Sequence, residues 1–354
     1  MRLLFGPWEP DQPAHLSKGL QVASGVYPAA NGYRPVGQFT VTQDALASAC
    51  KGAAAFVSPA GIAIIIAGTA SNLYKAFANG WASIGSGYSI QGDGRWRFAQ
   101  FGGLAIATNG VDDPVKYDLT TSALSPLDGD PPRMKLLAVV KDFLVGGVVD
   151  GDVAKLQWSG INDAEYWTAG QRQSDYQIMP TGGEITGIVG GEFGLVLQRS
   201  RITRMDYVGG NTIFDFSEIS TNIGCVSEHS MVQSGQLAFW RSDNGFIMWD
   251  GANIKPIGNE RVDRWFDSLY TKSDWAGASA AVDSKNNTVK WSMADQIITY
   301  NWVLDRWSLI PQAAELIFGG FALGLSLHEL DDIYADLESG PVTNDQVELG
   351  GRGR

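Results

Sequence analysis

The sequence is poor in the residues that hold metals and disulfides. It has two cysteines and three histidines among 354 residues. Cys50 and Cys225 lie too far apart to form a CxxC metal or redox site, so we expect both thiols to be reduced. None of His15, His229 and His328 has another histidine at the spacing of a zinc-binding pair. The sequence therefore predicts no metal site.

The motifs of several enzyme classes are also absent. There is neither a Gly-x-Ser-x-Gly nucleophile elbow nor a Gly-x-x-x-x-Gly-Lys-Ser/Thr phosphate loop. The carboxylates that a glycosidase could pair stand in turns containing Gly or Pro, where aspartate commonly caps its own backbone. They are Asp112, Asp113, Asp128, Asp130, Asp150, Asp152, Asp163 and Glu165. We expect no catalytic residue and no cofactor.

Long apolar runs are missing as well. The most apolar stretch, Gly61 to Gly68, is far shorter than the roughly 20 residues that span a membrane. Residues 1–5 are followed at once by Gly6-Pro7, which leaves no room for the apolar core of a signal peptide. We expect no stable membrane insertion and a protein that stays in the compartment where it is made.

Positive charge is scarce. The 26 Lys and Arg against 38 Asp and Glu give a formal net charge of −12, which disfavours tight binding of nucleic acid. Arg199, Arg201 and Arg204 form the one dense basic group. Alternation predicts that Arg199 and Arg201 share a strand face, which could meet an acidic neighbour, a phosphate or solvent at the edge of a sheet.

Glycine and aromatic residues are plentiful, and they recur with a period. The chain has 43 glycines, and 11% of its residues are aromatic. A unit of two apolar strands joined by a turn, the second strand ending in an aromatic residue, repeats about every 45 residues, which is the length of a propeller blade. The aromatic ends are Tyr74, Tyr117, Trp158, Tyr207, Trp249 and Tyr300.

This repeat predicts an all-β fold, a β-propeller of about six blades or more over residues 56–312. A blade cannot bury both of its faces alone, so the blades pack on one another and the ring removes exposed ends. Gly, Asn, Asp and Ser in the intervening turns suit tight hairpins. A β-sandwich or an irregular β-solenoid has similar turn spacing and stays open as an alternative.

The two flanks differ from the repeats. Residues 1–55 are rich in Pro and Gly and predict an extended arm that lies across another surface. In the C-terminal segment, 313–354, Ser326 and Glu329 have capping-box spacing, which predicts a short helix over about 326–338 followed by a disordered tail. An apolar stripe on that helix must dock on the propeller or on another subunit. The stripe consists of Leu330, Ile333, Tyr334 and Leu337.

Several strings along the chain carry a resemblance to a known family. The opening 5–13, Phe-Gly-Pro-Trp-Glu-Pro-Asp-Gln-Pro, is followed by Gly-Val-Tyr-Pro at 25–28 and Asn-Gly-Tyr-Arg-Pro at 31–35. Further strings lie at 158–167, 223–225, 239–245 and 326–332. In this order they resemble the nozzle or tail-hub proteins of short-tailed bacteriophages, also called packaged-DNA stabilisation proteins. The chain departs from them by ending soon after the last string, which leaves the final blade in doubt.

The resemblance implies a structural virion protein that is not an enzyme. It implies a homo-oligomeric ring, commonly of six copies, below the portal or adaptor and above tail plug or fibre proteins. It also implies that the ring lines the DNA exit channel, retains the packaged genome and lets double-stranded DNA pass transiently and without sequence specificity at ejection. The location would be the tail of the virion, after assembly in the host cytoplasm. An acidic channel wall would let DNA slide, which agrees with the net charge.

We expect contacts between copies at the arm, through Trp8, Tyr33 and Arg34, and at the apolar stripe of the C-terminal helix. A second hypothesis is a carbohydrate-binding propeller, lectin-like or receptor-binding. It requires three or more of the 12 tryptophans at equivalent exposed positions. A third hypothesis is a propeller hydrolase that uses aspartates near the axis.

Overall fold

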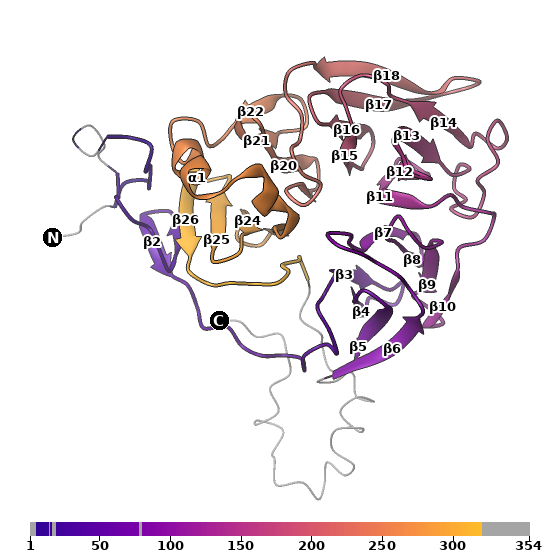
Figure 1. The fold of residues 1–354 in the computed structure, drawn as a ribbon, viewed down its shortest axis with the longest axis horizontal. Coiled ribbons are helices and arrows are strands. Elements are labelled where there is room, and N and C mark those ends of the chain that lie inside the picture. Colours follow the sequence, from indigo (N-terminus) through magenta and orange to yellow (C-terminus); the bar gives the residue numbers. More distant parts are fainter. Residues whose placement is uncertain (1–4, 14, 16–18, 78–79, 321–354) are drawn as a thin grey trace, which may run out of the picture.

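The structure is a computed structural model that describes residues 5–13, 15, 19–77 and 80–320. Six antiparallel sheets of four strands each surround a common axis (Figure 1). Within each sheet the four strands follow one another along the chain. The fold is therefore an all-β propeller of six blades, as the repeat predicted, and the sandwich and solenoid alternatives are wrong.

The strands occupy the following positions. Blade 1 consists of β3 (Gly52–Val57), β4 (Ala63–Gly68), β5 (Asn72–Phe77) and β6 (Gly80–Ser86). Blade 2 consists of β7 (Arg97–Phe101), β8 (Leu104–Thr108), β9 (Val115–Asp118) and β10 (Ala123–Pro126). Blade 3 consists of β11 (Met134–Val140), β12 (Phe143–Val149), β13 (Asp152–Trp158) and β14 (Asp175–Ile178).

The second half of the ring repeats this order. Blade 4 consists of β15 (Ile185–Val189), β16 (Gly194–Gln198), β17 (Ile202–Gly209) and β18 (Ile213–Ser220). Blade 5 consists of β19 (Val232–Ser234), β20 (Leu237–Ser242), β21 (Gly245–Trp249) and β22 (Ile254–Pro256). Blade 6 consists of β23 (Ser279–Asp283), β24 (Thr288–Ser292), β25 (Ile297–Asn301) and β26 (Arg306–Ile310).

The periodic aromatic residues mark the same position in every blade. All six of them lie on the third strand, in β5, β9, β13, β17, β21 and β25. Four of the six are at most 3% exposed. The turns have the expected chemistry: Asp150 and Gly151, with φ values of 52° and 83°, form the two-residue turn between β12 and β13. The register inferred from the sequence is confirmed.

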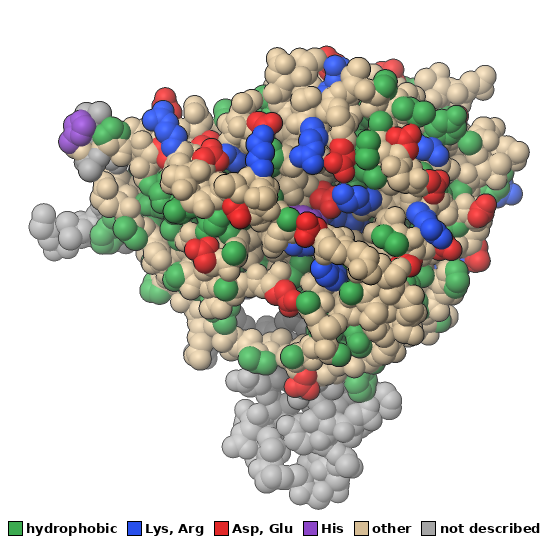
Figure 2. Space-filling model, viewed as in Figure 1, with side chains coloured by type: hydrophobic (Ala, Val, Ile, Leu, Met, Phe, Trp, Pro, Cys, Tyr) green, Lys and Arg blue, Asp and Glu red, His purple; other side chains and the backbone are tan. Residues whose placement is uncertain are grey.

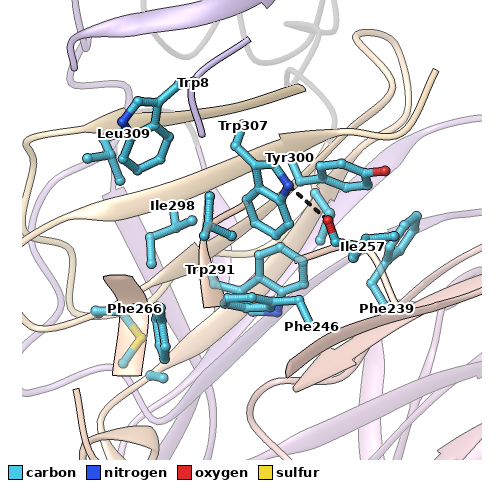
Figure 3. Packing of buried hydrophobic residues seen from close by; sticks show 14 of the residues in the cluster. Trp8, Phe239, Phe246, Ile257, Phe266, Trp291, Ile298, Tyr300, Trp307 and Leu309 are labelled. Carbon is cyan, nitrogen blue, oxygen red and sulfur yellow. Dashed lines mark hydrogen bonds between the residues drawn. The ribbon is translucent and has the colours of Figure 1, made fainter. Parts of the chain in front are cut away.

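Apolar side chains fill five of the six junctions between blades. Each of five buried clusters joins two consecutive blades, from the junction of blades 1 and 2 to that of blades 5 and 6. In the last of these, the ring of Phe246 lies 4.7 Å from that of Trp291 and 5.1 Å from that of Trp307 (Figure 3). These clusters supply the burial that a single blade cannot achieve alone.

The junction of blade 6 with blade 1, which we call the seam, is different. Among the described residues, no buried apolar cluster joins these two blades. Residues 311–320, which follow blade 6, lie between their first strands instead. The Ile317 N–H donates to Ser279 Oγ of β23 at 2.9 Å. On the other side, a Cβ placed on Gly320 would lie 3.9 Å from the Cβ of Ala55 in β3. The chain itself therefore bridges the seam.

The N-terminal arm lies on the outside of blade 6 of its own chain. Its hairpin, β1 (Val26–Ala29) and β2 (Gly32–Pro35), packs beside β26. Just before the hairpin, Ser24 forms a parallel bridge with Leu309 of β26. The propeller itself spans Gly52–Ile310, so it begins four residues earlier and ends two residues earlier than the expected range of 56–312.

Between blades 5 and 6 the chain forms two short helices that the sequence analysis missed. They are α1 (Asp263–Leu269) and the 3₁₀ helix η1 (Lys272–Ala276). The helix expected over 326–338 and the tail expected to be disordered lie outside the described residues. Cys50 and Cys225 are both free thiols, as expected.

Candidate functional site

Charged side chains from several blades meet near the propeller axis. The first strands of the blades lie nearest the centre, as β3, β7, β11 and β15 show (Figure 1). Arg97, at the start of β7, donates to the carbonyl of Glu228 at 3.1 Å and contacts His229 Nδ1 at 3.0 Å. Lys135 of β11 pairs with Glu184 at 3.4 Å and with Glu228 at 3.1 Å. These contacts join blades 2, 3, 4 and 5, and we call the group the axial network.

The electrostatics of the axial network keep its histidine neutral. His229 is 5% exposed. Burial, with Arg97, Arg95 and Lys135 nearby, lowers the pKa of His229 to about 2. Burial also lowers the pKa values of Arg95 and Arg97. A neutral imidazole can accept the hydrogen bond from the Arg97 guanidinium, which an imidazolium could not.

The axial network fills the end of the axis at which the blades begin. Its members bond to one another, and Arg95, two residues before Arg97, donates at 3.1 Å to the Ala276 carbonyl of η1, in the connection that leads into blade 6. The side chains of the network lie within hydrogen-bond distance of one another. Duplex DNA is much wider, since its major groove alone measures about 12 Å. Duplex DNA therefore cannot pass between these side chains. Around this centre, acidic and basic side chains are interspersed on the face shown in Figure 2.

Two of the residues expected at subunit contacts meet inside the chain. The Trp8 N–H donates to Tyr33 Oη at 2.8 Å, and the same hydroxyl donates to the Trp307 carbonyl at 3.1 Å. Trp8 is 2% exposed and packs edge-on against Trp265 of α1 at 4.9 Å. Burial raises the pKa of Tyr33. Trp8 is therefore buried on blade 6 and α1 of its own chain in this structure, and its role in a contact between copies stays a prediction.

Asp11 of the arm caps helix α1, a role that the sequence analysis missed. Its two carboxylate oxygens accept the N–H groups of Arg264 and Trp265 at 2.9 and 2.7 Å. Val262, at the N-cap position, makes no side-chain cap hydrogen bond, so the arm supplies what the helix lacks. A signal for α1 itself was present, because Val262, Phe266 and Leu269 have helical spacing.

The remaining expected contact residues divide into two groups. Arg34 is exposed and donates to Asn286 Oδ1, in the turn between β23 and β24, at 2.7 Å. Its guanidinium also lies 5.8 Å from the ring centre of Tyr27. Arg34 therefore remains available to another subunit, and its role there stays a prediction. Leu330, Ile333, Tyr334 and Leu337 lie outside the described residues.

The basic group at 199–204 has acidic partners. Arg199 and Arg201 lie in the turn between β16 and β17, not on a strand face, which corrects the prediction from alternation. Arg199 pairs with Glu184 at 3.3 Å, and Arg201 pairs with Glu218. Arg204 holds Asp206 through two hydrogen bonds, of 2.7 and 2.8 Å. Of the open alternatives, the acidic neighbour is the one observed.

Several turn carboxylates bond to backbone or to basic partners nearby. Asp112 accepts the Ser89 N–H at 2.9 Å, which with neighbouring hydrogen bonds lowers its pKa. Asp163 accepts the Glu165 N–H at 3.1 Å, and Asp152 accepts the Ala154 N–H at 2.9 Å. In residues 5–13, 15, 19–77 and 80–320, no group of three or more His, Cys, Asp or Glu could hold a metal ion.

The tryptophans do not form the exposed set that a sugar-binding propeller would need. Nine of the 12 are at most 4% exposed. The other three, Trp81, Trp265 and Trp302, are half-buried and lie in β6, in α1 and after β25, which are not equivalent positions. Buried indoles support the core instead: Trp307 Nε1 donates to the Ile257 carbonyl at 3.2 Å (Figure 3).

A cavity of about 480 Å³ opens at the seam. Its wall combines small side chains, such as Ala276 and Ala314, with the ionisable groups of Lys51, Arg95 and Glu315. Cys50 also lines it, and burial raises the pKa of this thiol. The cavity lies where the apolar cluster found at the other five junctions is missing. Among the described residues, no helix is long and apolar enough to cross a membrane.

Comparisons with known proteins identify no family for this chain. No family model matches it, and no curated protein sequence does. Solved structures that it resembles include the extracellular domain of a one-component system from B. thetaiotaomicron, with 13% identity and a TM-score of 0.48. That match covers 73% of this chain, which spans only 33% of the other protein.

Two propellers of similar size match at comparable levels. The Cps50 (Swd1) β-propeller domain of Myceliophteria thermophila has 10% identity, a TM-score of 0.49 and coverage of 79% of this chain and 92% of its own. The RRP9 WD40 repeats have 10% identity, a TM-score of 0.47 and coverage of 78% and 86%. All of these TM-scores lie below 0.5, so the fold assignment rests on the sheet topology alone.

Proposed function

We propose that this chain is a structural protein of a bacteriophage tail, which assembles into a homo-oligomeric ring, of six copies in the resembled family, around the DNA exit channel. The virion assignment rests on the resemblance of its ordered sequence strings to tail nozzle proteins. In this proposal the ring docks to a portal or adaptor above and to plug or fibre proteins below, and it retains the packaged DNA until ejection.

The observation that supports an assembly role is the filled axis. Side chains of the axial network bond to one another across four blades, and Arg95 reaches the connection that leads into blade 6. DNA would therefore pass through a channel enclosed by several copies and not through the axis of one propeller. Since the aromatic residues and the axis are committed to internal contacts, the outer surface is what the molecule offers to partners.

The charge of the chain fits a channel that does not hold DNA tightly. With a net charge of −12, the chain lacks the excess of Lys and Arg that releases counterions from duplex DNA. The acidic and basic side chains on the face in Figure 2 are interspersed and form no single-sign patch there. A wall of this kind would let DNA slide during ejection.

Negative-stain electron microscopy of the purified chain, alone and mixed with portal, adaptor and plug proteins of a short-tailed phage, tests the proposal. We expect rings with a central opening wide enough for duplex DNA. Monomers at every concentration and in every mixture would contradict it. A second measurement is DNA binding at low salt: tight binding that weakens steeply with salt would exclude the sliding channel.

A further inference from the structure

The arm behaves as a compact docking module. Trp8 is buried against α1, Asp11 caps the same helix, and the backbone beside the hairpin extends the sheet of blade 6. In that extension the Gly25 N–H donates to the Leu309 carbonyl, and the Leu309 N–H donates to the Ala23 carbonyl, both at 2.8 Å. All of these contacts reach blade 6 or its leading helix, so the arm recognises one defined surface.

A long exposed segment, residues 36–49, connects this module to blade 1. It contains no helix or strand, and 11 of its 14 residues are exposed. One contact with the propeller is the hydrogen bond from Trp81 Nε1, in β6, to the Asp44 carbonyl at 2.8 Å. Figure 2 shows an opening through the molecule where this segment passes blade 6. The segment is therefore a tether and not part of the packed body.

The tether also exposes large apolar side chains. Phe39 is 56% exposed and Val41 is 92% exposed. Burial of these two side chains between two molecules would be favourable. These features point to a neighbouring molecule beside the tether.

We propose that the arm is exchanged between copies of this chain: the arm of one copy docks on blade 6 of the next copy. The docking contacts are the same in both arrangements, so exchange sacrifices none of them. Only the path of the tether changes. Fully extended, 14 residues reach about 50 Å, which is ample for reaching a neighbour in contact.

Exchange dictates the geometry of the assembly. The tether then runs from blade 1 of one copy to blade 6 of the next, so every contact is head to tail. Contacts of this type close into a ring when the rotation between neighbours divides a full turn. The partner is a second copy of this chain because the docking surface already fits this arm. The inference rests on the self-association in the proposed function and specifies its mechanism.

A crosslink between arm and blade 6 distinguishes the two arrangements. Arg34 and Asn286 are in contact across the docking surface, and both sites are reachable. In full-length protein carrying Cys50→Ser, the pair Arg34→Cys and Asn286→Cys is treated with a short bis-maleimide and separated under denaturing conditions. The remaining thiol, Cys225, is buried and has a raised pKa, which protects it from the reagent. Each single variant serves as a control.

From oligomeric fractions we expect covalently linked species of two or more chains, up to the number of copies in the ring. From monomeric fractions we expect crosslinks within one chain. Rings that yield only intramolecular crosslinks would overturn the exchange and leave the proposed ring intact. A chain that is monomeric at every concentration and in every mixture with tail proteins would overturn both. The outcome thus separates the two proposals.

A matched pair of aspartate variants gives a second test in the native assembly. Asp11 caps α1 from the arm, whereas Asp274 caps η1 from within the same connection, through the Thr271 N–H. Because the docking contacts are the same in both arrangements, Asp11→Ala leaves the protein concentration needed for assembly unchanged. Exchange requires the arm to leave blade 6, so loss of the helix cap speeds the conversion between monomers and rings about tenfold. Asp274→Ala leaves that rate unchanged. Equal effects of the two variants on the rate, or no effect of Asp11→Ala, would overturn the exchange.

Discussion

The five packed junctions and the seam hold neighbouring blades together in different ways. At each packed junction, apolar residues of two consecutive blades form one buried cluster. At the seam, residues 311–320 and a cavity of about 480 Å³ occupy the corresponding space. The difference shows that this ring is closed by chain segments rather than by side-chain packing, with the arm and its tether on the outside.

The largest expected difference is in stability. Phe246, fully buried at the junction of blades 5 and 6, contacts Phe266, Trp291 and Trp307. Phe246→Ala should lower the free energy of unfolding by about 3–5 kcal/mol, because it leaves a cavity in a packed core. The matched variant Phe318→Ala, in the seam segment and 38% exposed, should cost less than about 1 kcal/mol. Urea denaturation measures both, and similar losses would contradict the comparison.

The two cysteines report on the two kinds of junction directly. Cys50 lines the seam cavity, and Cys225 is fully buried in the cluster of blades 4 and 5. Burial raises both pKa values, so access must decide the difference in rate. A thiol reagent should label Cys50 on the order of a hundredfold faster than Cys225 in the native protein. The single variants Cys50→Ser and Cys225→Ser show which cysteine gives the fast labelling phase and which gives the slow one. Equal rates would show that the seam is as closed as the other junctions.

The axial network makes the stability of the packed side of the ring depend on pH. The pKa of His229 is about 2 in the fold, against about 6.5 when unfolded, so the unfolded state binds the extra proton below pH 6.5. Stability therefore falls as pH decreases, by up to about 2 kcal/mol between pH 7 and pH 5 from this residue. His229→Gln should remove this part of the slope. An unchanged slope in denaturation curves at the two pH values would refute the assignment.

The smallest expected effect concerns the polar link across the seam. Arg95 donates to the Ala276 carbonyl, which connects the start of blade 2 with the segment that leads into blade 6. Arg95→Ala should cost about 1 kcal/mol, as for one hydrogen bond. In hydrogen exchange, amides of 311–320 should become less protected while those of β12 and β16 stay unchanged. Uniform loss of protection around the ring would argue against a local role.

The blades could be predicted from the sequence because the pattern that defines each strand and turn lies within a short stretch of chain. Tyr117, Trp158 and Trp249 each end a short alternating strand beside a turn, and the structure places all three on third strands. Helix α1 was not predicted although Val262, Phe266 and Leu269 have helical spacing, because it is only seven residues long and lies between two strand repeats.

The contacts of the arm and of the axial network could not be predicted from such local patterns. Asp11 and Arg264 are 253 positions apart, and Arg97 and His229 are 132 apart. Such pairs depend on how the ring brings blades together, and no pattern within one blade encodes them. Arg199 shows the opposite error: strand alternation was extended into a turn, where neighbouring residues do not alternate.

The path of the chain around the seam makes this fold suitable for rearrangement. Blade 6 ends and blade 1 begins on either side of residues 311–320 and the seam cavity, while the tether passes outside (Figure 1). New chain ends introduced within residues 36–49 would interrupt no strand of a blade, and with the arm kept in the protein they would leave all five buried clusters intact. The segment 36–49 could also accept an inserted domain. A cut between β12 and β13, by contrast, would divide a blade whose second strand is buried throughout.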